Sequence, residues 1–403
     1  MAVAGAGSER PAAAAWGSCL GGVTVQNEVH VEQPQQVYEA LRELRQAALA
    51  AAGPGMPPVR ATVLNLLAYA GDRMQAAEMA AQAAALAEQH PSRTIVLSVD
   101  PLGLAGDWDI SVSAHCHPAV PGHLVCFEGV ELVAHGEAVA QLPAVALSLL
   151  LRDLPVVLWW PGDVPFGSPL CEQLMASADR LLVDTASASD PEGLLRRLAD
   201  LSRAQRCMCT ISDYAWYRLL PWRELTAQFF DAPDCRPCLQ LLEQARLEVS
   251  APPERPVDWT QAYLLAAWLA TRLGWTPDTP LWTEAEGAQQ AHLRQGRRPV
   301  TLHFLAVPEV GAEPGLRSVA LRAAHPEGPA LFTIRRTSRE ARAELITQLP
   351  GREERLRIVP FALAGPTELL SAALRDMARD ATYEQALHLA ALLSARRQAE
   401  LAG

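Results

Sequence analysis

The chain has 403 residues, half of them apolar, and a formal net charge of −11. This length exceeds one ordinary hydrophobic core and predicts two domains, and the acidic balance argues against a nucleic-acid partner, whose phosphates favour a basic face. All 34 basic residues are arginine, which excludes a Schiff-base lysine, a phosphate-loop lysine and a lysine general base.

The first 55 residues are predicted to form a flexible segment followed by one helix. Residues 1–20 are rich in Ala and Gly, and they have neither a basic start nor an apolar core, so we expect no secretory signal and a cytoplasmic location. A helix is predicted over 33–53, where Gly53 ends it before a Pro-rich hinge. No apolar stretch in the chain is long enough to span a membrane, so we expect no membrane contact.

Residues 56–200 alternate between strand-like and helical segments, and the predicted α/β domain extends over 56–250. The strand-like runs are 61–70, 94–100, 109–117, 123–134, 155–160, 180–185 and 245–251. The helical segments are 72–89, 138–151, a helix beginning at Ser168-Pro169, another at Asp190-Pro191, and 221–230. The runs 109–117 and 123–134 favour an antiparallel pair. The alternation as a whole predicts an α/β domain with a mostly parallel sheet and helices on both faces.

Residues 251–403 show a different pattern, with short strands in series between helices, and this pattern predicts a smaller α+β domain. The Pro-rich stretch 252–256 is the candidate linker, and a capped helix follows over 258–274. Five short strands then come in series, at 299–307, 316–324, 330–337, 343–349 and 355–361. Turns between them predict an antiparallel meander, and the chain is helical from Thr367 onward.

The sequence contains none of the short motifs that hold nucleotides or activate a serine. G-x-x-x-x-G-K, a G-x-G-x-x-G after a strand, and G-x-S-x-G are all absent. A faint zinc-deaminase likeness, His30 to Glu32 with Cys235 and Cys238, is rejected because about 200 residues separate the two parts. We therefore predict no cofactor.

Histidines in one predicted strand are candidate metal ligands. His115 and His117 point to the same face of a strand and, with Cys126, offer three ligand types that zinc accepts. The usual closed site places paired ligands on turns, a pattern that is missing here. A polar strand face is the favoured interpretation, and no metal is predicted.

Two cysteine pairs lie near each other in the sequence and leave three interpretations open. Cys207 and Cys209 precede a C-x-x-C pattern formed by Cys235 and Cys238. Such a group can be inert thiols, a reversible redox pair or half of a zinc site. A separate weak hypothesis assigns an anion to Ser92 and Arg93, although a helix-ending His-Pro turn explains the same residues.

Tryptophan and arginine are interleaved in two stretches. The strand 155–160 ends in Trp159 and Trp160 just before a Pro161-Gly162 loop, and adjacent strand residues face opposite sides, so we expect one ring to support that loop. The second stretch holds Trp216, Arg218, Trp222 and Arg223, and the last two are expected near an exposed helix start. Trp and Arg dominate protein–protein hot spots, whereas core packing is the alternative for the tryptophans.

These motifs carry a family resemblance. The segments "HPSR", "DLPVVLWWPGD" and "WYRLLPWREL", in this order between residues 60 and 275, together with "AYLLAAWLATRLGW", resemble OpcA, a family of glucose-6-phosphate dehydrogenase assembly proteins of cyanobacteria and actinobacteria. The likeness is weaker beyond residue 275.

The resemblance implies a non-enzyme that binds glucose-6-phosphate dehydrogenase, promotes its active oligomer and raises its activity in the oxidative pentose phosphate pathway. It also implies redox control linked in cyanobacteria to thioredoxin, and it supplies no catalytic residue. On this interpretation the partner-binding residues are Trp159, Trp160, Pro161, Gly162, Trp216, Arg218, Trp222 and Arg223. The alternatives are a sugar-phosphate or nucleotide-sugar enzyme that uses Arg93 and Asp163, and a redox or zinc sensor built on the cysteines.

Overall fold

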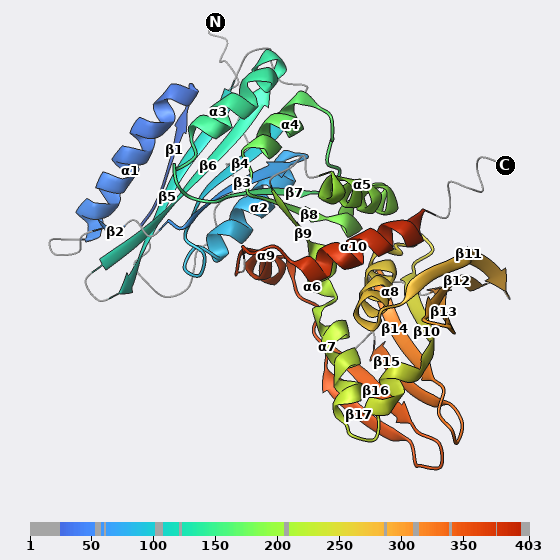
Figure 1. Ribbon diagram of the computed structural model, residues 1–403. Helices are drawn as coiled ribbons and strands as arrows, with labels where there is room; N and C mark the ends of the chain where they lie inside the picture. Colours follow the sequence, from blue (N-terminus) through green and yellow to red (C-terminus); the bar gives the residue numbers. More distant parts are fainter. Residues whose placement is uncertain are drawn as a thin grey trace, which may run out of the picture. The chain divides into compact units, whose positions relative to one another are not determined.

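The computed structural model describes residues 25–52, 58–59, 62–100, 108–120, 123–204, 209–285, 288–308, 314–337, 341–375 and 377–395. The chain divides into two compact units, an N-terminal unit of residues 1–155 and a C-terminal unit of residues 156–403 (Figure 1). Among the described residues, no helix combines the length and the apolar character that crossing a membrane requires. The predicted boundaries at residues 55 and 250 remain predictions.

The N-terminal unit is built on one mixed sheet. Its strands are β1 (Val25–Val31), β2 (Pro58–Val59), β3 (Leu64–Ala70), β4 (Ser92–Asp100), β5 (Trp108–Val120) and β6 (His123–His135). They lie in the order β1-β5-β6-β4-β3, with β2 beside β6. The β1, β5 and β6 pairings are antiparallel, as predicted for the β5–β6 pair, and β6, β4 and β3 run parallel. Strand β3 is a nearly continuous apolar run, and both β3 and β4 are buried along most of their length, as expected for strands covered on both faces.

Three helices pack on this sheet. They are α1 (Val37–Ala52) against β1 and β5, α2 (Arg73–Ala85) against β3 and β4, and α3 (Leu142–Ser148) against β4 and β6. Asp72 caps α2 by accepting a hydrogen bond from the Gln75 amide at 2.8 Å, as the local sequence predicts. The predicted helix over 138–151 is shorter than expected. A 3-10 helix, η2 (Gly136–Gln141), precedes α3, which takes Pro143 into its first turn, where the missing proline N–H is tolerated.

The C-terminal unit begins with three parallel strands in sequential order. These strands are β7 (Val156–Pro161), β8 (Arg180–Asp184) and β9 (Thr210–Asp213). Helix α4 (Pro169–Ala176) follows β7, and α5 (Pro191–Arg203) follows β8. Their caps, Ser168 and Asp190, accept from backbone amides at 3.2 and 2.8 Å, so both predicted helix starts are confirmed.

A second sheet of eight strands completes the C-terminal unit. The strands are β10 (Leu242–Ala251), β11 (Thr276–Ala285), β12 (Ala288–Gln295), β13 (Arg298–Pro308), β14 (Gly315–Ala323), β15 (Ala330–Thr337), β16 (Arg342–Gln348) and β17 (Arg355–Pro360). Their order is β11-β12-β13-β10-β14-β15-β16-β17. Helices α6 (Tyr214–Arg218), α7 (Leu220–Gln228), α8 (Thr260–Leu273), α9 (Pro366–Arg375) and α10 (Ala381–Ser394) accompany it.

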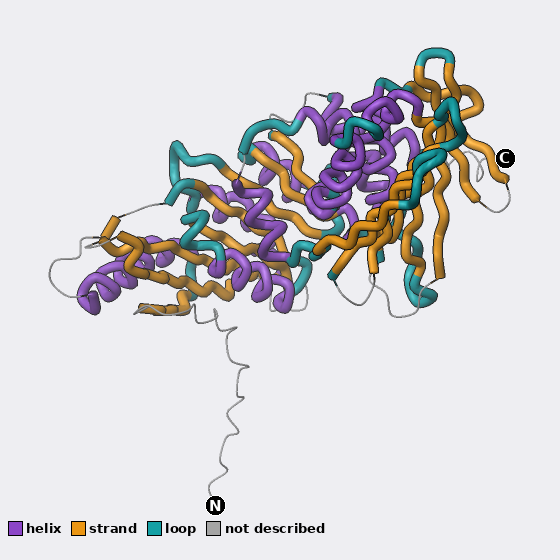
Figure 2. Tube along the Cα trace, turned by 90° about the horizontal axis from the view of Figure 1, so that it is seen from below, coloured by secondary structure: helices purple, strands orange, loops and turns teal. Residues whose placement is uncertain are grey.

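Helices lie along one face of the second sheet (Figure 2), and α7 contacts β15. Helix α8 packs against β10 and β14, and its Tyr263 ring lies 5.1 Å from the Phe304 ring of β13. After α7, Phe229 and Phe230 place their rings 5.5 and 5.0 Å from Phe332 of β15. Alternate strand residues such as Leu247 are buried on this face.

The predicted fold class is confirmed: mostly parallel strands with helices precede a sheet with antiparallel strands. The meander holds for β14 to β17, whose pairings are all antiparallel. It fails between β13 and β14, because β10 lies between them, parallel to β13 and antiparallel to β14. The strand at 245–251, expected beside the earlier strands, therefore belongs to the second sheet. Local periodicity cannot reveal such a partner, because it reports burial and not pairing.

Candidate functional site

The loop that follows β7 is held by the second tryptophan of the strand. The Trp160 indole N–H donates to the Asp163 carbonyl oxygen at 3.1 Å, and Gly162 takes φ +101°, a conformation that favours glycine. The Asp163 carboxylate accepts from the amide and the hydroxyl of Ser189 at 2.8 and 3.0 Å. The prediction that one tryptophan supports the loop is confirmed. Asp163, assigned to the alternative enzyme site, is engaged by this chain's own loop.

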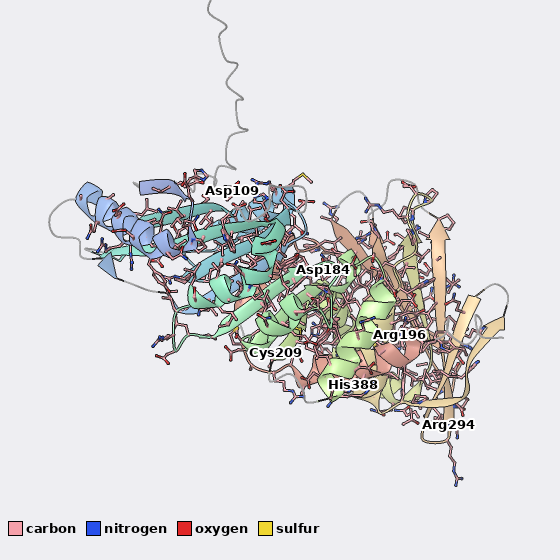
Figure 3. The ribbon with its side chains drawn as sticks, turned by 90° about the horizontal axis from the view of Figure 1, so that it is seen from above. Asp109, Asp184, Arg196, Cys209, Arg294 and His388 are labelled. Atoms are coloured by element: carbon pink, nitrogen blue, oxygen red, sulfur yellow. The ribbon has the colours of Figure 1, made fainter. Side chains whose placement is uncertain are left out.

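Strand β8 ends in a buried ion pair. Asp184, labelled in Figure 3, accepts two hydrogen bonds from Arg218, at 2.6 and 2.8 Å. This is the bidentate geometry that guanidinium and carboxylate favour. The Asp184 side chain is 5% exposed and the Arg218 side chain 24% exposed. Burial would lower the pKa of Arg218, but the hydrogen bond and the charge of Asp184 raise it above its usual value.

Strand β9 ends in a second buried carboxylate. Asp213 accepts from the amides of Thr185 and Ala215 at 3.1 and 2.9 Å and from the Thr185 hydroxyl at 2.8 Å. The Tyr383 hydroxyl of α10 donates to it at 3.4 Å. Burial raises the pKa of Asp213 to about 6, and the nearby Asp184 adds to the rise, against the hydrogen bonds that favour the charged form.

The start of helix α10 is hydrogen-bonded to α6 and to the end of β9, through Asp380 and Tyr383. Asp380 caps the helix by accepting from the Tyr383 amide at 2.9 Å, and it also accepts from the Trp216 indole N–H at 2.9 Å. At the other end of the helix, Arg196 of α5 donates to the Ser394 carbonyl at 2.9 Å. The contacts of Asp380 with Trp216 and of Ser394 with Arg196 join residues more than 160 positions apart, so no sequence spacing could have indicated them.

The predicted partner-binding tryptophans are buried. Trp159, Trp160 and Trp216 are each 2% exposed, and Trp222 is 0% exposed. The expectation that Trp222 stands near an exposed helix start is wrong, because its ring packs edge-on against Phe361 at 4.9 Å. All four tryptophans are core residues. The partner contact proposed for Pro161, Gly162, Arg218 and Arg223 remains a prediction.

Arg223 stacks on one of these rings. Its guanidinium carbon lies 3.6 Å from the centre of the Trp216 ring, a close cation–π contact. One of its amino groups donates to the Trp216 carbonyl oxygen at 3.3 Å. Burial lowers the pKa of Arg223 to about 10. The residue is therefore part of the packing around α6 and not a side chain extended into solvent.

In the N-terminal unit, Arg93 is buried and already paired. Its Nε donates to Glu128 at 2.8 Å, and its Nη1 donates to the Leu149 carbonyl at 2.8 Å. Arg45 approaches the other Glu128 oxygen at 3.3 Å. Ser92 is buried as well, with its hydroxyl 3.0 Å from that of Thr94. This geometry opposes the anion-binding role that Ser92 and Arg93 were given.

The cysteines divide into two kinds. Cys235 and Cys238 are free, buried thiols, and burial raises the pKa of both, which opposes the thiolate form that redox exchange requires. Cys209 is disulfide-bonded. Cys207 lies outside the described residues, as do the side chains of His115, His117 and Cys126. Within the described part of the chain, no group of three or more His, Cys, Asp or Glu side chains could hold a metal ion.

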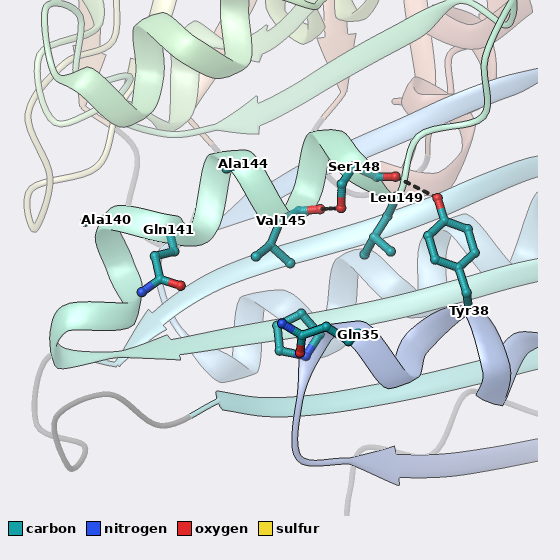
Figure 4. A pocket seen from close by; sticks show the side chains of 9 residues that line it. Gln35, Tyr38, Ala140, Gln141, Ala144, Val145, Ser148 and Leu149 are labelled. Atoms are coloured by element: carbon teal, nitrogen blue, oxygen red, sulfur yellow. Dashed lines mark hydrogen bonds between the residues drawn. The ribbon is translucent and has the colours of Figure 1, made fainter.

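A shallow apolar groove lies between the start of α1 and α3 in the N-terminal unit (Figure 4). Its volume is about 510 Å³, and the Tyr38 hydroxyl closes one end by donating to the Ser148 carbonyl at 2.6 Å. The two sides of this groove are about 100 residues apart in the chain, so no local sequence pattern indicates it. It is lined mainly by small and apolar side chains and lacks the convergent polar groups of a typical catalytic pocket.

The fold is that of an α/β protein, and side chains and backbone groups of the same chain bond to the carboxylates at the ends of β8 and β9. Open parallel sheets bind ligands at the carboxyl ends of their strands, yet here Asp184 and Asp213 are satisfied by Arg218, Thr185 and the first turn of α6. Neither carboxylate was among the predicted site residues. Each directly ends a strand, in "RLLVD" and "TISD", and that position was the available signal.

Two family models match most of the chain. Residues 83–200 match the glucose-6-phosphate dehydrogenase subunit N-terminal domain, and residues 209–387 match the corresponding C-terminal domain. The chain belongs to the OpcA family of glucose-6-phosphate dehydrogenase assembly proteins, which confirms the resemblance noted in the sequence.

Curated relatives come from cyanobacteria. A putative OxPP cycle protein OpcA of Synechococcus elongatus is 30% identical over 77% of this chain and 70% of its own length. The protein of the same name from a Synechocystis strain is 29% identical over 55% of this chain, and the match spans only 46% of that relative.

Solved structures show a more distant likeness. A 3-ketoreductase from Actinomadura kijaniata aligns with 84% of this chain and 98% of its own, at a TM-score of 0.45 and 9% identity. The transcriptional regulator Gal80p of a Kluyveromyces yeast aligns with 92% of this chain and 97% of its own, at a TM-score of 0.45 and 10% identity. No activity is inferred from a likeness at this level.

Proposed function

We propose that this chain binds glucose-6-phosphate dehydrogenase, promotes its active oligomer and raises its activity, without catalysing a reaction itself. The observation that carries the proposal is the pair of family models, which together run from residue 83 to residue 387 and are both described as parts of a glucose-6-phosphate dehydrogenase subunit. The names of the curated relatives agree with a role in the oxidative pentose phosphate pathway.

The carboxylates that end β8 and β9 are engaged by contacts within the chain, and this supports a non-catalytic role. A catalytic carboxylate must reach its substrate, whereas Asp213 is buried and bonded to Thr185, Ala215 and Tyr383. Asp163 and Arg93, the residues of the alternative enzyme site, are likewise occupied by contacts within the chain. The enzyme interpretation is therefore the weaker proposal.

Several properties remain predictions. These are redox regulation, contact with thioredoxin, a cytoplasmic location and the absence of nucleic-acid and membrane partners. A redox or zinc sensor built on Cys235 and Cys238 would need these thiols to open to solvent, because both are buried in this structure.

The proposal is tested by titrating purified glucose-6-phosphate dehydrogenase of the same organism with the purified chain. We expect saturable binding, a rise in the dehydrogenase rate at the same concentrations, and no turnover of glucose 6-phosphate by the chain alone. Binding without any change in rate would remove the activation from the proposal, and no binding would overturn it.

A further inference from the structure

The last strand of the second sheet is an open edge. Strand β17 pairs with β16 and stands at the end of the strand order; among the described residues no strand pairs with its other side. In an antiparallel pair, alternate residues direct their N–H and C=O groups away from the partner strand. The outer groups of β17 are therefore available to another strand, and all its residues except Val359 are exposed.

The two faces of β17 differ in chemistry. Leu356 and Ile358 share one face and are 56% and 58% exposed, which is unusual for large apolar side chains on an edge strand. On the same face, the register places Leu356 beside Ile346 and Ile358 beside Glu344. The edge thus presents an apolar strip next to unused backbone hydrogen-bonding groups.

Arginines occupy the opposite face. Arg357 donates to the neutral amide oxygen of Gln228 at 2.8 Å, a contact that leaves its charge uncompensated there. Arg355 lies 3.3 Å from Asp234, but Arg352 lies 2.6 Å from the same carboxylate oxygen, so two positive charges share one negative charge. This face of the strand is therefore suited to acidic side chains on a neighbouring strand.

A second copy of the chain matches the charges of this edge poorly. The two antiparallel registers that overlap β17 most with its own copy are centred on Arg357 and on Ile358. The first places Arg357 opposite itself, and like charges directly opposite each other destabilise a strand pair. The second places Arg357 opposite Val359, so neither register brings an acidic side chain to Arg355 or Arg357, whereas an acidic segment does.

We propose that β17 is a docking edge that takes up an extended segment of a partner protein as a ninth strand, with acidic residues opposite Arg355 and Arg357 and apolar residues opposite Leu356 and Ile358. Backbone hydrogen bonds supply affinity in such strand addition, and alternate side chains supply specificity. The inference rests on the proposed function in one respect, because it assigns the segment to glucose-6-phosphate dehydrogenase.

The test uses the full chain and the intact dehydrogenase. The variants are the double substitution Leu356→Ser/Ile358→Ser and the charge reversal Arg357→Glu. The matched control is Met74→Ser on α2, a side chain that is 72% exposed in the N-terminal unit. Melting temperatures establish that each variant is folded. We expect each β17 variant to bind the dehydrogenase at least about tenfold more weakly than the original chain, while the control keeps its affinity.

Amide hydrogen exchange supplies an independent readout. Exchange in residues 355–359 should slow in the complex, because the amides on the outer side of β17 gain a strand partner. The docking edge is overturned, with the proposed function intact, if the original chain binds but both variants bind equally well, or if exchange in 355–359 is unchanged. A β17-dependent dimer of the chain alone would also overturn the assigned occupant. Failure of the original chain to bind would overturn both proposals.

Discussion

Replacing Arg218 by alanine tests whether the buried ion pair at the end of β8 stabilises the C-terminal unit. The substitution leaves Asp184, 5% exposed, without the guanidinium that accounts for two of its hydrogen bonds. It also leaves that charge near Asp213, whose pKa Asp184 already raises. An uncompensated buried charge destabilises a protein by about 3–5 kcal/mol.

The partial exposure of Arg218 favours the lower end of that range, about 3 kcal/mol. For a unit of this size, that loss lowers the melting temperature by roughly 6–12 °C. Calorimetry or circular dichroism measures the shift. The matched control is Arg203→Ala, because Arg203 pairs with Asp200 at 3.2 Å on the surface, with side chains 51% and 78% exposed. That variant should lose at most about 1 kcal/mol.

A second substitution distinguishes charge from packing. Adding Asp184→Asn to Arg218→Ala removes the uncompensated charge and should restore part of the lost stability. If Arg218→Ala melted like Arg203→Ala, the ion pair would not stabilise the C-terminal unit. If the double variant were less stable than Arg218→Ala, the uncompensated charge would not be the cause of the loss.

Because the folded-state pKa of Asp213 is about 6 and its usual value is 3.8, its contribution to the free energy of unfolding is fully present below about pH 4 and is lost as the pH rises through 6. Urea titrations from pH 4.5 to 7.5 should show this loss in the original chain and not in Asp213→Asn; equal slopes would contradict it. Trp160→Phe removes the hydrogen bond to the Asp163 carbonyl at a cost of about 1 kcal/mol. It should accelerate amide exchange in 161–167, and unchanged exchange would mean that the ring does not hold the loop. Cys235 and Cys238 should react with a thiol reagent far more slowly in the folded chain than in urea, since burial raises the pKa of both. Rapid labelling of the folded chain would restore the redox interpretation.

Local signals in the sequence predicted the elements and their starts. Ser168-Pro169 and Asp190-Pro191 each begin a helix as expected, because a cap and a proline in the first turn act within a few residues of each other. Strands β7 and β8 follow in the same way from short apolar runs. Such features depend on neighbouring residues alone.

Features that depend on distant residues were not predictable. The insertion of β10 between β13 and β14, and the hydrogen bond from Tyr383 to Asp213, join segments that no periodicity relates. The burial of Trp222 was missed because a helix start is often exposed, whereas here Phe361, far along the chain, covers it. Tertiary packing decided these cases, and a single sequence carries no record of it.

Burial distinguishes tryptophans that stabilise the fold from residues that could contact a partner protein. Trp159, Trp216 and Trp222 were proposed to touch a partner because Trp is common at hot spots. In the structure they are core residues, and their truncation to alanine should lower stability by roughly 3–5 kcal/mol. Effects of such substitutions on partner binding therefore need a stability measurement beside them.

The most direct test of the assembly function is the size of glucose-6-phosphate dehydrogenase measured by analytical ultracentrifugation with and without the chain, beside its rate in the same samples. The assembly account predicts that the chain shifts the dehydrogenase to a larger oligomer and that the rate rises over the same range of chain concentration. An unchanged dehydrogenase sedimentation profile and an unchanged rate at saturating chain would contradict it.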